Sequence, residues 1–171
     1  MLSLIKTLLG REPQTRCTLV YGNRRVATMM FKEELEDLKD RYLQRFTLLP
    51  VFSREAQDAP LFNGRLDEAR VGQFLTTLVP ADSIDEAFVC GPAGMLDGAV
   101  AALAGAGLPA ERVHVERFGD VNAAAAHHVE EARFARVGGG CLRQHHGIGR
   151  RRDVVERTFQ HAHQSVEPML R

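Results

Sequence analysis

The chain has 171 residues, enough for one ordinary domain with some length left over. Its 22 lysine and arginine residues balance its 22 aspartate and glutamate residues, which argues against a dedicated nucleic-acid binder, because such proteins carry a basic excess. No apolar run reaches the roughly 20 residues that span a bilayer, so we expect no membrane segment.

Helix-like and strand-like patterns alternate along the first 119 residues. Apolar residues at helical spacing predict a helix over 2–9, and the apolar run over 17–21 predicts a buried strand. Asp67 is a suitable cap for a later helix that Pro80 stops. The other expected elements are helices over 28–42 and 93–106 and strands over 46–52, 87–90 and 113–118.

Two of the expected helices have a clear apolar face. Phe31, Leu35, Leu38 and Tyr42 share one side of the helix over 28–42. The core face of the helix after Asp67 is expected to consist of Val71, Phe74, Leu75 and Leu78. Short strands that alternate with such helices are typical of βαβ units, so the fold class is α/β with a parallel sheet.

The composition changes near Gly119. All three lysines precede this residue, whereas six of the seven histidines follow it. Residues 123–128 have the composition of a linker, 131–137 fit either a short strand or a helix, and the remainder has no sustained period. We therefore expect a domain over 1–119 and, over 120–171, a linker and a mostly disordered tail.

The strongest motif is an apolar strand, Phe88-Val89-Cys90, that runs directly into Gly91-Pro92-Ala93-Gly94-Met95 and an alanine-rich helix. The carboxyl ends of parallel strands are where open α/β folds bind ligands. Together with the later segment Glu116-Arg117-Phe118-Gly119, this motif resembles the NAD(P)-binding domain of ferredoxin–NADP reductase-like flavoenzymes. The likeness is closest to the reductase subunits of bacterial phenylacetyl-CoA epoxidases, and it covers residues 1–119.

The resemblance implies a three-layer parallel sheet that lacks its first, central strand. That strand would lie between the strand ending at Tyr21 and the strand ending at Cys90, and it would lead into the turn that cradles the pyrophosphate. The flavin-binding barrel that the family carries upstream has no counterpart here. We therefore expect a four-stranded fragment that is inactive as a reductase by itself.

The resemblance also implies residues for the adenosine half of the nucleotide. Ser53 and Arg54 match the pair that holds the 2′-phosphate of NADP, since a hydroxyl and a guanidinium suit a dianion. Asn23 and Arg24 match the neighbouring loop. The tyrosine that stacks on adenine in plant-type members has no clear counterpart near Phe62, so NADPH is the expected cofactor while NADH stays open. Without the family, each arginine would be interpreted as a solvated surface charge.

A second group of residues is implied for the reacting end. Cys90, Gly91 and Pro92, with Met95 in the same motif, match residues beside the nicotinamide. Glu116 and Phe118 match the acid and the aromatic ring that close over the flavin. The resemblance thus assigns Cys90, Glu116 and Phe118 catalytic roles, although Cys90 alone would be interpreted as a small buried hydrophobe and Phe118 as a core aromatic.

The tail departs from the family. Epoxidase-type reductases continue into a [2Fe–2S] domain with four cysteine ligands, whereas residues 120–171 hold only Cys141. One interpretation is that 131–137 are the first strand of that domain, followed by sequence read in a shifted frame. Three cysteines without close spacing predict neither a disulfide framework nor a metal site, and they favour a reducing cytoplasm.

The function predicted from the sequence is that of a fragment of an NAD(P)H-dependent flavoprotein oxidoreductase. In the intact family, electrons pass from NADPH through FAD and a [2Fe–2S] cluster to an oxygenase, here expected in phenylacetate or other aromatic degradation. The expected partners are NADPH, the flavin and ferredoxin domains and the oxygenase, with no nucleic acid and no membrane. The alternative is a non-catalytic nucleotide-binding or assembly module.

Overall fold

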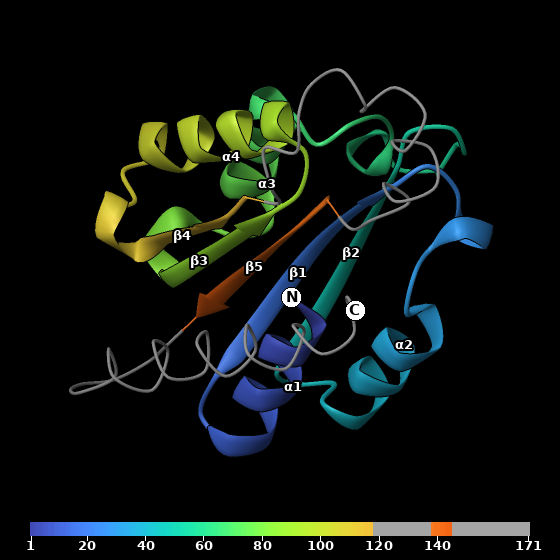
Figure 1. Cartoon of the computed structure of the whole chain (residues 1–171), viewed down its shortest axis with the longest axis vertical. Helices are drawn as coiled ribbons and strands as arrows, with labels where there is room; N and C mark the ends of the chain where they lie inside the picture. The colour runs from blue at the N-terminus through green and yellow to red at the C-terminus, as the bar shows by residue number, and fades with distance from the viewer. Residues whose placement is uncertain (118–137, 145–171) are drawn as a thin grey trace, which may run out of the picture.

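The computed structural model describes residues 1–117 and 138–144, in which helices and strands alternate. The helices are α1 (Leu2–Arg11), α2 (Lys32–Arg41), α3 (Glu68–Thr77) and α4 (Ala93–Gly105). The strands are β1 (Arg16–Asn23), β2 (Phe46–Phe52), β3 (Ile84–Cys90), β4 (Val113–Glu116) and β5 (Gly138–Gln144). They form one sheet in the order β2-β1-β5-β3-β4 (Figure 1).

The α/β fold class is confirmed. β1 pairs in parallel with β2, and β3 pairs in parallel with β4. One core cluster joins α1 and α2 to Leu19 and Phe88, and another joins α3 and α4 to Val89. Because successive residues of a strand point to opposite faces, Phe88 and Val89 show that the two pairs of helices cover opposite faces of the sheet. The result is three layers.

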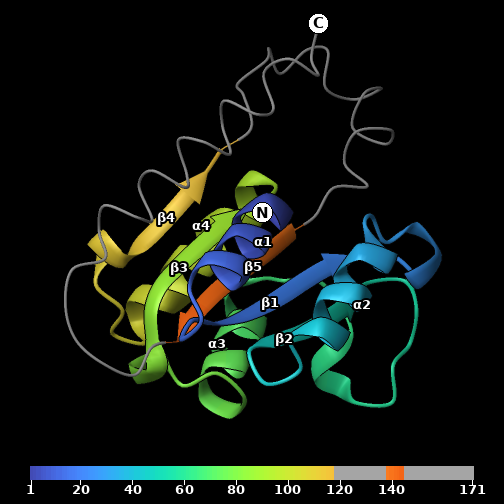
Figure 2. The same cartoon turned by 90° about the horizontal axis from the view of Figure 1, so that it is seen from below.

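β5 occupies the centre of the sheet, where the sequence predicted a gap. It pairs antiparallel with β1 on one side and with β3 on the other, as both views show (Figures 1 and 2). The predicted strand neighbours of the gap are right, but the four-stranded remnant is wrong. A gap would leave unpaired backbone groups on both neighbours, and pairing with β5 avoids that cost.

Local sequence does not indicate β5, because glycine is depleted in strands and three glycines open this one. We expected no regular element at this position and a mostly disordered tail over 120–171. The strand at 138–144 corrects the first expectation. The linker over 123–128, the short element over 131–137 and most of the tail lie outside the described residues.

The second helix begins four residues later than predicted, at Lys32 instead of Thr28. Phe31, which precedes it, has a left-handed backbone with φ 56°. A residue in this conformation interrupts a right-handed helix. The residues Val26–Thr28 form a separate short 3₁₀ helix, η1, which leaves the end of β1 as a structured loop instead of a helix start.

The third helix confirms one prediction and corrects another. Asp67 caps α3, since its Oδ1 accepts a 2.8 Å hydrogen bond from the backbone N–H of Arg70. The expected core residue Leu78 is 47% exposed, whereas Val79 is 2% exposed. The helix ends at Thr77, and the N–H of Val79 donates to the carbonyl of Phe74, which turns Val79 inward. The helical period cannot be extended past that turn.

α3 and α4 approach each other closely at a glycine. A Cβ atom built on Gly98 would lie 2.8 Å from the backbone nitrogen of Glu68, closer than Cβ atoms come to atoms that they are not bonded to. At Gly105, in the same helix, a Cβ would meet no atom within 4 Å. Gly98 therefore sets the packing of these two helices, and Gly105 does not.

The β2 edge of the sheet carries two irregular features. Pro50 lies within β2, paired with Tyr21 of β1, and proline has no N–H to donate. Asn63 forms an isolated parallel bridge with Phe52 at the end of the same strand. In the described part of the chain, no helix is long and apolar enough to cross a membrane.

Candidate functional site

The candidate site residues gather at the carboxyl edge of the sheet. β1 and β2 run in the same direction as β3 and β4, because β1 and β3 are both antiparallel to β5. The residues that end or follow these strands therefore share one edge. They form two groups. The first group is the arginine corner, which consists of Asn23, Arg24, Ser53 and Arg54 together with Glu55 and Arg65. The second group is the cysteine corner, which consists of Cys90, Gly91, Pro92 and Glu116.

The backbone ties the two loops of the arginine corner together. The N–H of Ser53 donates to the carbonyl of Asn23 at 2.9 Å, and the N–H of Arg54 donates to the carbonyl of Arg24 at 3.0 Å. These bonds continue the pairing of β1 with β2 beyond the ends of both strands. The side chains of Arg24, Ser53 and Arg54 are at least partly exposed. The two predicted arginines thus lie on neighbouring segments with their side chains open to solvent.

Side chains hold the first of these loops in shape. The Asn23 side-chain amide donates to the carbonyl of Arg25 at 2.8 Å and to the hydroxyl of Thr28 at 3.2 Å. Glu55 Oε2 accepts a 2.9 Å hydrogen bond from the backbone N–H of Val26. Glu55 follows Arg54 directly, so it joins the second loop to the first. Asn23 was predicted as a site residue, whereas Glu55 was missed.

The segment after Arg54 folds back onto the same strand end. Asn63 closes this loop, because its side chain accepts from the N–H of Gln57 at 2.7 Å and donates to the carbonyl of Gln57 at 2.8 Å. The N–H of Gly64 donates to the carbonyl of Phe52 at 2.9 Å. Arg65 follows Gly64 directly and is exposed. The loop thus brings a third arginine back to the end of β2.

Sequence reasoning missed Arg65. Nothing local distinguishes Arg65 from a surface arginine, since its relation to Arg54 depends on a long loop that returns to the strand. Phe52 and Asn63 form a parallel bridge. Arg54 comes two residues after Phe52, and Arg65 comes two residues after Asn63, so the two arginines hold equivalent positions on neighbouring segments. Asparagine and glycine favour turns, so the pair Asn63-Gly64 is the sequence signal that the chain turns just before Arg65.

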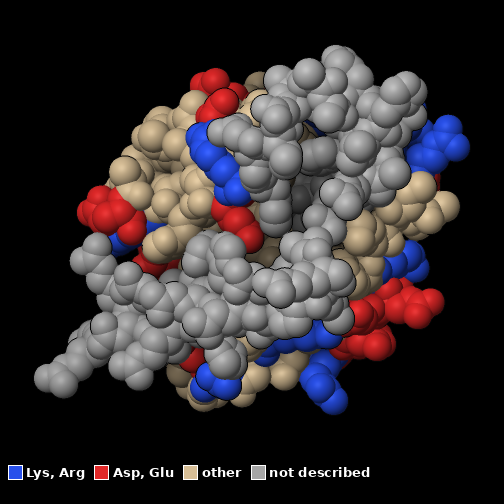
Figure 3. All heavy atoms as spheres, in the orientation of Figure 1, with Lys and Arg blue, Asp and Glu red and all other residues tan. Residues whose placement is uncertain are grey.

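The arginines of the arginine corner, Arg24, Arg54 and Arg65, are not held in ion pairs among the described residues. On the face shown in Figure 3, the described acidic and basic side chains are interspersed. Guanidinium groups donate several hydrogen bonds in a planar fork, which suits the oxygens of a phosphate. The corner is therefore suited to an exposed phosphate dianion.

The cysteine corner lies at the ends of β3 and β4. Cys90 is the last residue of β3, is 5% exposed, and lies in register with Glu116, the last residue of β4. Pro92 precedes α4, and its carbonyl accepts from the N–H of Met95 and Leu96. The structure thus brings Cys90, Gly91, Pro92 and Glu116 together at neighbouring strand ends. Their role at one end of a ligand stays a prediction.

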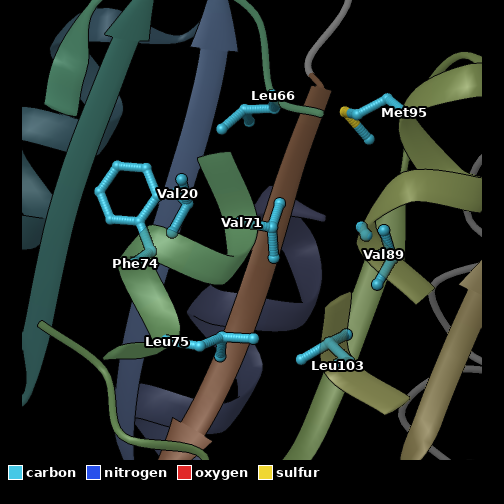
Figure 4. Close-up of a pocket in the computed structure, with 9 residues that line it drawn as sticks. Val20, Leu66, Val71, Phe74, Leu75, Val89, Met95 and Leu103 are labelled. Carbon is cyan, nitrogen blue, oxygen red and sulfur yellow. The ribbon is translucent and has the colours of Figure 1, made fainter. Parts of the chain in front are cut away.

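Two predicted site residues are not part of this corner. Met95 packs into the apolar layer between the sheet and helices α3 and α4. It lines a cavity of about 40 Å³ there, with Val20, Phe74 and Leu103 among its neighbours (Figure 4). Phe118 lies outside the described residues. A cofactor contact by Met95 and a catalytic role for Phe118 stay predictions.

The two corners lie on either side of the point where the strand order reverses. From this point the chain proceeds outward from β1 to β2 on one side and from β3 to β4 on the other. Such switch points are where doubly wound sheets bind dinucleotides across the crevice. β2 and β3 lie three strand spacings apart, or about 14 Å. The corners are therefore placed for the two ends of an elongated ligand.

The family profile of the oxidoreductase NAD-binding domain matches residues 1–101. The chain belongs to this family. The match covers β1 to β3 and most of α4, and with them both loops of the arginine corner and most of the cysteine corner. A nicotinamide nucleotide is thus the class of ligand that this family of domains indicates.

Curated proteins similar to this NAD-binding domain include components of oxygenase systems. The chain is 46% identical over 118 residues to one of the subunits of 1,2-phenylacetyl-CoA epoxidase from Escherichia coli (strain K12), which is 69% of this chain and 33% of that protein. It is 30% identical over 122 residues to the ferredoxin reductase component of 3-ketosteroid-9-alpha-monooxygenase of Rhodococcus rhodochrous, covering 71% of this chain and 31% of that protein.

A third similar protein is a cytochrome b5 reductase. The chain is 33% identical over 86 residues to NADH-cytochrome b5 reductase 2 of Neosartorya fischeri, which is 49% of this chain and 25% of that protein. The chain thus spans about a third or less of the length of these relatives. In the described residues, no group of three or more histidine, cysteine or acidic side chains could hold a metal ion.

Proposed function

We propose that this chain is the nicotinamide-nucleotide-binding part of a flavoprotein reductase that takes electrons from NADPH and delivers them to an oxygenase. The proposal rests on the NAD-binding family and on relatives named as part of an epoxidase and as the reductase component of a monooxygenase. We further propose phenylacetate or related aromatic degradation as its pathway. A reducing cytoplasm is the compartment that we propose from the cysteine usage.

The observation that carries the proposal is the set of three solvent-accessible arginines at the end of β2. Arg24, Arg54 and Arg65 come from three neighbouring segments and have no ion-pair partner among the described residues. The hydroxyl of Ser53 adds a donor beside Arg54. NADPH differs from NADH by the 2′-phosphate on its adenosine ribose, and this phosphate is the group that we assign to the corner.

We assign the nicotinamide end to the cysteine corner. NADPH would supply the hydride there, and the flavin of the intact reductase would receive it. Cys90 and Glu116 lie in register at neighbouring strand ends, so a thiol and a carboxylate flank the same position. Gly91 has no side chain to exclude a flat ring from the backbone, and Pro92 holds the start of α4. These residues bind and orient the ring.

The other redox groups of such a reductase do not fit this chain alone. A plant-type [2Fe–2S] cluster needs four cysteine thiolates, and the whole sequence has three cysteines, of which Cys17 and Cys90 are buried in β1 and β3. The described residues form a nucleotide-binding fold with no second sheet for a flavin. We therefore assign FAD and the cluster to the flavin and ferredoxin domains of the intact reductase.

The experiment compares nucleotide binding by the wild type and Arg54→Ala, with Arg112→Ala as the control. Arg112 is also exposed but precedes β4, at the opposite edge of the sheet. Losing a charge-assisted contact of about 1.5–3 kcal/mol should weaken NADPH binding by about tenfold or more in Arg54→Ala, with no change in Arg112→Ala. Calorimetric titration with NADPH and with NADH measures both effects.

The same titrations separate the proposal from its alternatives. Equal affinity of the wild type for NADPH and NADH would contradict the assignment of the 2′-phosphate to the arginine corner. No binding of either nucleotide would favour the non-catalytic assembly module. A loss of NADH affinity in Arg54→Ala as large as the loss of NADPH affinity would indicate a general effect on the fold.

A further inference from the structure

Arg70 lies in the first turn of α3, next to the loop that carries Arg65. Asp67 caps this helix, and the backbone N–H of Arg70 is the donor to that cap. Arg70 is partly buried, and its Nη1 donates to the carbonyl oxygens of Pro60 at 2.8 Å and Leu61 at 3.2 Å. The cap fixes where the helix begins, and the guanidinium connects that beginning to the loop.

The carbonyl groups that Arg70 contacts belong to a short 3₁₀ helix, η2 (Pro60–Phe62). Carbonyl groups at the end of a helix lack a partner within it and need a donor from elsewhere. Nη1 of Arg70 is such a donor. Further along α3, the ring of Phe74 packs against the ring of Phe62, with the two centroids 5.9 Å apart. α3 therefore holds η2 by a polar contact and by an apolar one.

The turn that follows η2 lies directly against the guanidinium of Arg70. Gly64 has a φ of 101°, a left-handed conformation that glycine adopts readily. A Cβ atom built on Gly64 would lie only 3.3 Å from Nη2 of Arg70. The N–H of Gly64 donates to the carbonyl of Phe52 at 2.9 Å. Gly64 is therefore tied to the end of β2 and lies next to the side chain that comes from α3.

Arg65 stands between two anchored neighbours. Gly64 precedes it, and Leu66, which follows it, is 8% exposed and packs with Phe74 in the apolar layer beneath α3 (Figure 4). Arg65 itself is exposed and has no ion pair among the described residues. The backbone position of Arg65 is therefore set by the loop, while its guanidinium faces solvent. Arg70 differs from Arg65 because its guanidinium bonds to the loop.

We propose that Arg70 is a positioning residue of the nucleotide site, which holds the loop over 55–64 against α3 so that Arg65 stays beside Arg54. Arg54 and Arg65 hold equivalent positions on neighbouring segments. A loop that is already fixed in the binding conformation loses less entropy when a phosphate binds to both guanidinium groups. Arg70 thereby sets the preference for a nucleotide with a 2′-phosphate. The inference rests on the proposed function and names a residue that determines its specificity.

Two alanine substitutions test the position of the loop while every arginine is retained. Gly64→Ala puts a side chain on a backbone with φ 101° and brings its Cβ to 3.3 Å from Nη2 of Arg70. Gly107→Ala is the matched control, because Gly107 has φ 89° but no atom within 4 Å of a Cβ, and it follows α4 at the opposite edge of the sheet. Gly64→Ala should bind NADPH about tenfold more weakly and NADH as the wild type does. Gly107→Ala should bind both as the wild type does.

Arg70→Met tests the guanidinium itself and keeps an unbranched side chain in its place. The affinity for NADPH should fall about tenfold and that for NADH should stay unchanged, while Arg112→Met, the control, changes neither. If Arg70 acts through Arg65, Arg65→Ala should lose at least as much NADPH affinity, and adding Arg70→Met to it should cause no further loss. Losses that multiply in the double variant would show that Arg70 contacts the phosphate itself and would overturn the positioning role.

Amide hydrogen exchange reports on the loop without a ligand. The N–H of Gly64 donates to the carbonyl of Phe52, and the N–H of Asn63 donates to the carbonyl of Pro60 at 3.2 Å. Both amides should exchange faster in Arg70→Met than in the wild type, and at the wild-type rate in Arg112→Met. A loss of NADPH affinity in Arg70→Met with unchanged exchange at both amides would overturn the positioning role.

The titrations keep this inference apart from the proposed function. An equal loss of NADPH and NADH affinity in Gly64→Ala and Arg70→Met would overturn the inference, because the loop would then support the nucleotide as a whole. Unchanged NADPH affinity in both variants would overturn it as well. Neither result contradicts the proposed function as long as Arg54→Ala loses NADPH affinity. Equal affinity of the wild type for NADPH and NADH would overturn both.

Discussion

The backbone N–H of Arg54 donates a 3.0 Å hydrogen bond to the carbonyl oxygen of Arg24. The two arginines that the sequence predicted separately are thus joined by their main chains, just beyond the ends of β1 and β2. A substitution that shifts one loop also shifts the other. If both side chains bind one phosphate, as we propose, we expect them to act as a coupled pair rather than as separate contacts.

This coupling predicts non-additive losses of NADPH affinity. We propose that both guanidinium groups bind the same phosphate. In Arg24→Ala or Arg54→Ala, the remaining guanidinium should therefore hold that phosphate less well than it does in the wild type. The double variant should then lose less affinity than the product of the two single losses, with a coupling of about 0.5–3 kcal/mol. Calorimetric titration of the four proteins measures the cycle. Losses that multiply within error would show that the two arginines bind independently.

Glu55 is predicted to position the arginine corner through a hydrogen bond, since its Oε2 accepts from the N–H of Val26. Glu55→Ala removes this acceptor and should weaken NADPH binding by about tenfold, the value of one bond to a charged group. Glu55→Gln keeps an acceptor and removes a negative charge beside the phosphate, so its affinity should equal or exceed that of the wild type. Tighter binding by Glu55→Ala would contradict the positioning role.

The preference for NADPH over NADH should depend on pH through the ligand. A phosphate monoester loses its second negative charge as the pH falls below about 6, whereas arginine stays protonated. The ratio of NADPH to NADH affinity should therefore be highest above about pH 7 and decrease toward about pH 5. Titrations across this range measure the ratio, and NADH corrects for changes in the protein. A constant ratio would exclude the dianion as the recognised form.

Gly98 is predicted to be essential for the packing of α3 against α4. A Cβ at this position would lie 2.8 Å from the backbone nitrogen of Glu68, so Gly98→Ala should lower the free energy of unfolding by about 1–3 kcal/mol. Gly105→Ala, in the same helix with no atom near its Cβ, should be neutral or stabilise by up to about 1 kcal/mol. Urea unfolding of both variants measures their free energies of unfolding. Equal changes in the two variants would contradict the prediction.

Local sequence signals predicted most of the helices and strands well. Apolar periodicity located α1 and β2, the Asp67 cap was correct, and the strand that ends in Cys90 was recognised from its motif. These features depend on residues close together in the chain. Cys90 and Glu116 followed from a known family pattern, and their register on β3 and β4 agrees with it.

The features that the sequence did not predict depend on distant contacts. β5 joins the sheet through backbone pairing that glycine-rich sequence does not suggest, and Arg65 reaches the arginine corner only because its loop returns to Phe52. Val79 is buried in place of the expected Leu78, because α3 ends at Thr77 and the helical pattern does not continue past it. In each case the deciding interaction is with a residue that local periodicity cannot identify.

The two outer strands of the sheet have a consequence for how copies of this chain meet. An exposed strand edge can template intermolecular β-pairing, the first step of many aggregates. Here Pro50 removes a donor from β2, Asn63 occupies the end of that strand, and β4 has only four residues, Val113–Glu116. Among the described residues, neither edge offers a long, regular row of free donors and acceptors. Self-association through continuous intermolecular sheets is therefore disfavoured at both sides of the fold.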